Sequence, residues 1–195
     1  LFDQGVACLV FDFRAHGSSR GHRSTVGWEE QQDVATALNH ARRRFPGLGM
    51  FVWGSSMGGV ATVFALTKPG APTVEAVILD SPYASLLEAN RGWWRTFLGK
   101  WGRLVEPVWW FTRLLGAPDA RQVTLAESLS QLSVPALMLY GDQDLMVPMA
   151  SVESLREASN GARFEIFQGA GHSQPRWVDV DRYDALILEF LRDHG

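Results

Sequence analysis

The stretch Gly54–Gly58, which reads GSSMG, decides the fold because of what stands on either side of it. Gly49–Trp53 before it is typical of a short buried strand, and Val60–Leu66 after it is typical of a helix of small residues. A strand–turn–helix with the pattern G-x-S-x-G projects its central serine from a sharp turn, which requires small neighbours. The bare pattern also fits an ordinary turn, but its flanks favour Ser56 as the nucleophile of an acyl-transfer enzyme.

The helix that follows this turn bears on the chemistry as well. Its amino end points at Ser56, and the helix dipole favours negative charge developing there. The backbone N–H of Met57 is therefore the predicted donor to the oxyanion of a tetrahedral intermediate. Ser55 is the rival nucleophile, but Trp53 stands where its leading glycine would be required.

Strand and helix patterns alternate along the rest of the chain. Short apolar runs typical of buried strands are Val6–Phe13, Val74–Leu79, Pro135–Tyr140 and Arg163–Phe167. Helical spacing is found over Trp28–Phe45, Met149–Ser159 and Asp181–Leu191. The alternation predicts an α/β fold with a mostly parallel sheet covered by helices on both faces. Cys8 lies in the first run, so we expect its thiol to be buried and inert.

Composition excludes several classes of protein. Hydrophobic residues make up 46% and charged residues 20%, as in ordinary globular proteins. The net charge of -3 shows no basic excess, so no nucleic-acid partner is expected. The single cysteine allows no internal disulfide and is compatible with a reducing compartment, which favours the cytoplasm. We see no targeting segment or membrane-spanning run, and we expect no metal or organic cofactor.

A serine nucleophile needs a base, and the base needs a carboxylate that orients it. His172 stands in the tight loop GAGHS after the last predicted strand, and loops at the carboxyl ends of parallel strands line the active crevice. Asp142 and Asp144 follow one predicted strand and Asp80 follows another. The sequence alone therefore offers three candidates for the acid. The order Ser56, Asp144, His172 is the order expected when the nucleophile turn comes first.

These motifs resemble the α/β-hydrolase superfamily, in particular its lysophospholipase, monoacylglycerol-lipase and serine-aminopeptidase-like branch. Phe11–Ser19, FDFRAHGSS, is similar to the branch's D-x-R-G-H-G-x-S segment and departs from it at Ala15, where glycine is usual. Ser56 falls on the family's nucleophile, His172 on its G-x-H base, and Asp144 on the acid of its G-x-x-D-x-x-V-P segment. The resemblance implies an α/β-hydrolase fold and selects Asp144 among the candidate acids.

The resemblance also implies strands that this sequence does not contain. Family members carry three further strands before the position of Val6–Phe13, and the third of them lies between the counterparts of Val6–Phe13 and Gly49–Trp53. The loop after that third strand supplies the second oxyanion donor. We therefore expect either an N-terminally truncated sequence, or a Val6–Phe13 strand that has moved over to pair with the sheet, since an unpaired buried strand is costly.

Residues 84–129 separate two predicted strands by more than a usual connection and predict an inserted helical cap. The expected division is a partial core with the serine turn over 1–83, the cap over 84–129, and the core with the acid and base loops over 130–195. The cap contains most of the tryptophans and several basic residues: Trp93, Trp94, Trp101, Trp109, Trp110, Arg91, Arg95, Lys100, Arg103 and Arg113.

Two roles for this cap remain open. Its aromatic side chains can pack it onto the core, with the basic residues as a solvated face. Alternatively, the cap lines an acyl pocket or makes a peripheral contact with an anionic membrane surface. We expect Tyr83, Trp93 and Trp94 to line the substrate pocket.

The sequence thus predicts a serine hydrolase acting through Ser56, His172 and Asp144. The expected substrate is a small-molecule or lipid-like carboxylic ester with an apolar acyl chain, as for a carboxylesterase, lysophospholipase or acylglycerol lipase. Serine at the turn argues against a dehalogenase or epoxide hydrolase, which would carry aspartate. The alternatives are a peptidase or amidase with the same triad, and a catalytically weak hydrolase-like fragment or binding protein.

Overall fold

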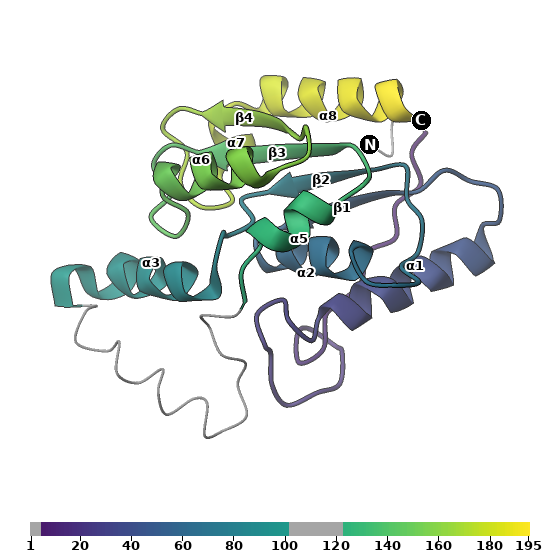
Figure 1. The fold of residues 1–195 in the computed structure, drawn as a ribbon, viewed down its shortest axis with the longest axis horizontal. Coiled ribbons are helices and arrows are strands. Elements are labelled where there is room, and N and C mark those ends of the chain that lie inside the picture. The colour runs from purple at the N-terminus through teal and green to yellow at the C-terminus, as the bar shows by residue number, and fades with distance from the viewer. Residues whose placement is uncertain (1–4, 102–122) are drawn as a thin grey trace.

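The chain forms a parallel sheet between layers of helices, as Figure 1 shows for a computed structural model that describes residues 5–101 and 123–195. The sheet has four strands in the order β1-β2-β3-β4: β1 Phe51–Ser55, β2 Ala76–Asp80, β3 Ala136–Gly141 and β4 Arg163–Phe167. The helices are α1 Gln31–Arg44, α2 Met57–Leu66, α3 Leu86–Leu98, α5 Ala126–Gln131, α6 Met149–Ala158, α7 Pro175–Val178 and α8 Val180–His194.

The two faces of the central strands pack against different helices. On β2, Val77 and Leu79 join the core cluster built with α1, α2 and α6, whereas Ala76 and Ile78 join the cluster built with α8. Figure 1 shows α8 on one side of the sheet and α1 and α2 on the other. Because successive side chains of a strand alternate between faces, a strand covered on both is apolar throughout. The predicted parallel sheet with two helical layers is confirmed.

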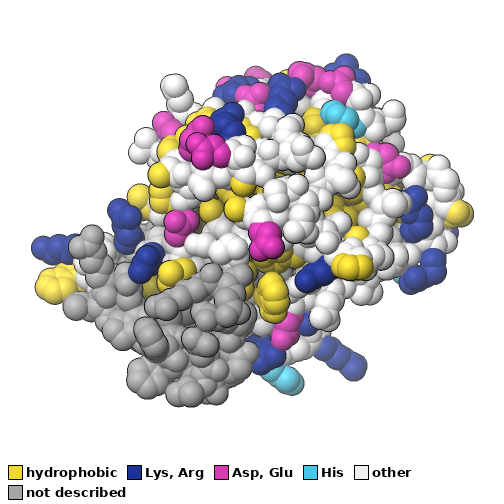
Figure 2. All heavy atoms as spheres, in the orientation of Figure 1, with side chains coloured by type: hydrophobic (Ala, Val, Ile, Leu, Met, Phe, Trp, Pro, Cys, Tyr) yellow, Lys and Arg dark blue, Asp and Glu magenta, His cyan; other side chains and the backbone are white. Residues whose placement is uncertain are grey.

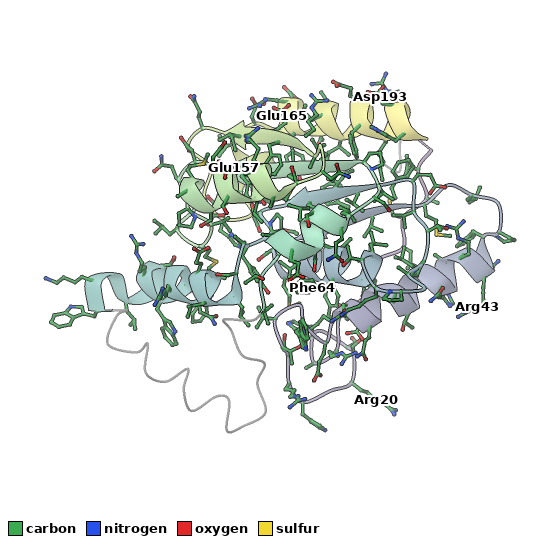
Figure 3. All side chains as sticks on the ribbon, viewed as in Figure 1. Arg20, Arg43, Phe64, Glu157, Glu165 and Asp193 are labelled. Carbon is green, nitrogen blue, oxygen red and sulfur yellow. The ribbon has the colours of Figure 1, made fainter. Side chains whose placement is uncertain are left out.

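The helices follow from their apolar spacing and from the charges at their ends. In α1, Val34 and Leu38 are buried one turn apart, with Asp33 in the first turn and arginines in the last. Phe64 of α2, labelled in Figure 3, is buried and meets Trp28 edge to face with ring centroids 5.7 Å apart. Figure 2 shows acidic and basic side chains intermixed on the outer surface over α8, as expected for the solvated face of an amphipathic helix.

The predicted strand over Val6–Phe13 is wrong. This run pairs with no strand, and Val10 is 90% exposed. Cys8 is also exposed, which contradicts the expected buried thiol. The physical reason is that the run has no strand to pair with. Within the described residues, β1 is an edge strand of the sheet, and the Val6–Phe13 run does not lie alongside it as a fifth strand. Burial without pairing would leave backbone N–H and C=O groups without partners.

The family-like segment after this run is held to α1 by Arg14. Its guanidinium donates to Asp33 at 2.9 Å and to Glu29 at 3.2 Å. Ala15, which stands where the family usually has glycine, adopts φ 57°. A left-handed conformation costs an L-residue about 1–2 kcal/mol, so the turn keeps its shape with a strained alanine in place of glycine.

The predicted cap range is described in part. α3 begins after Ser85, whose side chain accepts a hydrogen bond from the Glu88 N–H, and α5 packs against α6 and α2 of the core. Trp109, Trp110, Arg103 and Arg113 lie outside the described residues. Over 5–101 and 123–195, none of the helices has the length and apolar character to span a membrane.

Candidate active site

The turn between β1 and α2 holds Ser56 in a strained conformation. Ser56 has φ 49° and ψ −116°, and its N–H donates to the Asp80 carbonyl at the end of the neighbouring strand, at 2.7 Å. A Cβ at Gly54 would lie 2.6 Å from the Gly58 backbone. Only glycine allows so close an approach. Gly54 is therefore the small residue that lets the strand reverse tightly into the helix, whereas a Cβ at Gly58 would come no closer than 3.6 Å to Phe13.

His172 and Asp144 complete a hydrogen-bonded series with this serine. The Ser56 Oγ and His172 Nε2 atoms are 2.7 Å apart, and His172 Nδ1 and Asp144 Oδ2 are 2.8 Å apart. Asp144 Oδ1 accepts from the N–H groups of Met146 and Val147 at 2.8 and 3.0 Å. The Asp144 side chain is fully buried and the His172 side chain is 20% exposed. The loops after β3 and β4 thus bring both partners to Ser56.

The rival residues have other partners. Ser55 Oγ lies 3.0 Å from Ser173 Oγ, whereas the two ring nitrogens of His172 bond to Asp144 and Ser56. Asp142 Oδ1 accepts from the Gly169 N–H at 2.7 Å, so it ties the loop after β3 to the loop after β4. Neither Ser55 nor Asp142 hydrogen-bonds to the histidine.

Asp80, the third candidate acid, has both carboxylate oxygens occupied by hydroxyl groups. Tyr183 on α8 donates to Oδ2 at 2.7 Å, and Ser81 donates to Oδ1 at 2.9 Å. Burial raises the pKa of the Asp80 carboxyl, and these two hydrogen bonds oppose the shift only in part. Ser81 Oγ also accepts from the Ser173 N–H at 3.1 Å, next to His172. Asp80 therefore supports the loops around the site.

A buried glutamate just before α1, Glu30, organises one wall of the site. The carboxylate of Glu30 accepts four hydrogen bonds of 2.8 Å, from the N–H and the hydroxyl of Thr25, from the Ser24 hydroxyl and from the Gly27 N–H. Burial raises the pKa of Glu30, but the hydrogen bonds outweigh it and hold the pKa below its ordinary value.

The loop that Glu30 holds brings Val26 against Tyr83, whose hydroxyl donates to the Val26 carbonyl. Both residues line a cavity of about 390 Å³ that opens on Ser56 and His172. All three predicted pocket residues, Tyr83, Trp93 and Trp94, line this cavity. The lining residues that the sequence analysis missed are Val26, Ala89, Asn90 and Met146. No sequence signal separates these four from ordinary core and cap positions.

The sheet, the strained serine turn and the serine–histidine–aspartate series together define a protein of the α/β-hydrolase class. A family model described as "alpha/beta hydrolase fold" matches residues 106–175, and one described as "Serine aminopeptidase, S33" matches residues 1–124. The chain belongs to this serine aminopeptidase S33 family of α/β hydrolases.

Individual relatives support the same placement. The chain is 25% identical over 195 residues to the uncharacterized protein YqkD of Bacillus subtilis, covering 98% of this chain and 64% of that protein. It is 30% identical over 151 residues to the lysophosphatidylserine lipase ABHD12 of Danio rerio, covering 76% of this chain and 38% of that protein. The chain therefore spans less than two thirds of the length of these curated relatives.

Solved structures give the same fold. The Pyrococcus furiosus esterase Pf2001 superimposes with a TM-score of 0.73 at 24% identity, covering 94% of this chain and 69% of that chain. At this identity the likeness concerns the fold, and the function has to be argued from the site itself.

Proposed function

We propose that this protein hydrolyses carboxylic esters with an apolar acyl chain, with Ser56 as the nucleophile. The observation that carries the proposal is the unbroken hydrogen-bond series from Ser56 Oγ through His172 to Asp144 at the wall of a largely apolar cavity. The strained backbone at Ser56 supports it, because strain at a polar residue in such a turn is typical of reactive positions.

The proposed reaction has two steps. Ser56 Oγ attacks the ester carbonyl carbon while His172 Nε2 takes the hydroxyl proton; that proton then passes to the alcohol oxygen as the ester bond breaks. Water attacks the acyl-enzyme in the second step, with His172 again taking and returning a proton, and the carboxylic acid leaves. Asp144 accepts from Nδ1–H throughout, which fixes the tautomer and stabilises the imidazolium.

Negative charge develops on the carbonyl oxygen in both steps. Met57 is the first residue of α2, and its backbone N–H is the donor we assign to that oxygen. The amino end of α2 adds a favourable field, since the helix dipole is positive there. Loss of a single oxyanion donor costs about 10²–10³ in rate in enzymes of this kind.

The runner-up function is that of an aminopeptidase, which the description of the matching family suggests. An aminopeptidase must bind the free α-ammonium group of its substrate, and a buried cation requires a carboxylate or a set of acceptors. The described residues that line the cavity include neither Asp nor Glu. This composition favours an ester over an aminoacyl peptide.

A fluorophosphonate probe tests the nucleophile, and paired substrates test the bond that is cleaved. We expect the probe to label the wild-type protein and Ser55→Ala but to leave Ser56→Ala unlabelled. We expect p-nitrophenyl octanoate to be hydrolysed and aminoacyl-p-nitroanilides to remain intact. Labelling of Ser56→Ala would remove Ser56 as the nucleophile, and faster anilide cleavage would favour the aminopeptidase.

The predicted membrane contact through the cap stays a prediction. It is supported by exposed aromatic side chains on and just after α3, with Trp93 47%, Phe97 64% and Trp101 63% exposed. Lys100 and Arg95 lie among them. Flotation with vesicles with and without anionic lipid tests it, and no binding to either kind of vesicle would remove it.

A further inference from the structure

Val26, which lines the cavity beside Ser56, has a backbone conformation that valine rarely adopts. Its φ is 52°, in the left-handed region, where a β-branched residue is an outlier. Glycine adopts such a φ freely, and asparagine does so more readily than valine. Backbone strain of this kind persists only where the surrounding structure enforces it, and it concentrates at functional sites. The contacts that enforce it at Val26 therefore bear on what this wall of the cavity does.

Hydrogen bonds hold the backbone on both sides of Val26. The Glu30 carboxylate accepts from the N–H groups of Thr25 and Gly27, each at 2.8 Å. The Val26 N–H donates to the Ser24 hydroxyl oxygen at 3.2 Å. Because Glu30 is fully buried, water does not compete readily for its hydrogen bonds. The two residues that flank Val26 are thus tied to one fixed carboxylate.

Packing against the core removes the remaining freedom of this loop. The Tyr83 hydroxyl donates to the Val26 carbonyl. Gly27 has φ 97°, and a Cβ there would lie 3.2 Å from both Tyr83 Oη and Val60 Cγ1, tighter than most Cβ contacts. The loop therefore cannot turn over to relieve the strain. Since both backbone polar groups of Val26 are bonded within the protein, the isopropyl group is the part left to meet a ligand.

The isopropyl group is a rigid part of the cavity wall. Val26 is 36% exposed and lines the cavity together with Ser56 and His172. A β-branched side chain has little rotamer freedom, so a fixed backbone also fixes its methyl groups. Val26 is the one β-branched residue in the described lining, whereas Met146 has an unbranched side chain that adapts to what it contacts. A rigid apolar group at this point suits discrimination between ligands by size.

We infer that Val26 is a specificity-determining residue that limits the length of the acyl chain accepted in the cavity. The inference rests on the proposed ester hydrolysis for its substrate class. In an apolar pocket one methylene group changes kcat/KM by about tenfold or more, so a methyl group held rigidly in the wall is enough to select between acyl chains. Glycine, which adopts the left-handed conformation without strain, would leave this part of the cavity empty.

The test compares kcat/KM for p-nitrophenyl esters from butanoate to palmitate in the wild-type protein, Val26→Gly and Val26→Ile. In Val26→Gly we expect the preferred acyl chain to lengthen by about two carbons or more, and kcat/KM for that longer ester to rise about tenfold relative to the ester that the wild-type protein prefers. Val26→Ile adds one methylene group and should shorten the preferred chain. Val180→Gly is the matched control, since Val180 is 43% exposed and outside the described lining; it should leave the profile unchanged.

Shifts in opposite directions for the smaller and the larger side chain support the inference, because a purely structural role would lower kcat/KM at all chain lengths alike. Equal losses at every chain length, or the same shift in both variants, would overturn it.

A comparison of Val26→Gly with Val26→Ala tests the strain independently. Both variants lose the isopropyl group, but only glycine adopts the observed φ without strain. We expect the folding equilibrium constant from urea denaturation to be about two- to fivefold larger for Val26→Gly, the reverse of the usual order of these two residues. A larger constant for Val26→Ala would overturn the claim that the loop holds Val26 under strain.

Titration calorimetry with 1-alkanols from hexanol to dodecanol separates the inference from the chemistry. The proteins are Ser56→Ala and the same variant with Val26→Gly added. We expect the chain length at which affinity stops rising to be longer when Val26→Gly is present. That shift supports the role of Val26 even if no p-nitrophenyl ester is hydrolysed, a result that would refute the proposed function alone. Ester hydrolysis with an unchanged chain-length profile in Val26→Gly would refute the role of Val26 alone.

Discussion

The carboxyl ends of β2 and β3 each bury an aspartate, and the two residues have opposite relations to the site. Asp144, after β3, has one oxygen on His172 and the other on two backbone N–H groups. Asp80, at the end of β2, has both oxygens on hydroxyl groups, and neither contacts the histidine. Adjacent parallel strands therefore present the same residue type at the same edge of the sheet for different purposes.

The partners explain the difference. Backbone N–H groups favour the charged form of a carboxylate and leave an oxygen free for the imidazole. At Asp80 the two hydroxyl groups compensate the cost of burying the carboxylate charge only in part, so burial raises the pKa of Asp80. Asp144, beside the histidine, is held by backbone N–H groups, whereas Asp80 is held by side-chain hydroxyl groups.

The largest expected effect is that of Asp144→Asn. The amide N–H can donate to Nδ1 and so reverse the histidine tautomer, which leaves Nε2 protonated and unable to accept from Ser56. We expect kcat/KM for p-nitrophenyl octanoate to fall by about 10⁴. Asp80→Asn serves as the matched change one strand away and should retain activity within about tenfold. Similar losses in both variants would erase the distinction between the two strand ends.

Glu30→Gln should have the next largest effect, on stability. Four donors surround the Glu30 carboxylate, and an amide that replaces one oxygen can no longer accept from all of them. We expect the free energy of unfolding to fall by about 1–3 kcal/mol, measured by urea denaturation at pH 7. Glu29→Gln, on the same loop but only half-buried, is the control, and an equal loss there would count against the network.

The pH dependence of that loss has a definite sign. The folded-state pKa of Glu30 lies below its ordinary value of 4.5, so its stabilisation is present above that value and disappears as pH falls through the folded pKa. The deficit of Glu30→Gln should therefore shrink in acid. A deficit that grows as the pH falls would contradict the assignment.

Asp80→Asn should show the opposite slope. The folded-state pKa of Asp80 is raised above 3.8, so its contribution is most favourable below 3.8 and is lost as pH rises through the folded value. Relative to the wild-type protein, Asp80→Asn should gain stability between acid and neutral pH. Urea denaturation at several pH values measures this, and parallel curves for the two proteins would show that burial does not disfavour the charged form.

The smallest effect is expected for Asp142→Asn. Its single hydrogen bond, from the Gly169 N–H, is solvent-exposed, and an asparagine oxygen can accept it equally well. We expect less than about 1 kcal/mol of lost stability and nearly unchanged kcat/KM. A large loss of activity would mean that Asp142, two residues before Asp144, contributes to the chemistry after all.

Sequence reasoning succeeded for features that a local pattern determines, such as apolar periodicity and the placement of glycine. The strands β1 to β4 and the helices α1, α2, α6 and α8 are predicted by apolar runs and periodicity, with boundaries shifted by a few residues. Such reasoning failed for Val6–Phe13. Its apolar pattern is that of a strand, but a strand forms only beside a partner strand, and the pattern contains no information about that partner.

The choice among candidate residues was only partly accessible. Resemblance selected Asp144, but the residues alone did not separate it from Asp142 or Asp80, which also follow buried strands. Val26 carries no recognisable motif, and Glu30 is one of two adjacent glutamates at a helix start. Their roles depend on which atoms lie within hydrogen-bonding distance after the chain has folded.

By itself, the sequence determined the sheet with its two helical layers and the sharp turn at Ser56, since hydrophobic periodicity and glycine placement act locally. Tertiary structure alone decided which aspartate meets His172 and that Glu30 holds a cavity wall. The physical reason is that hydrogen bonding is short-ranged and directional. A shift of about 1 Å in a loop exchanges one partner for another without altering the pattern of apolar residues that builds the fold.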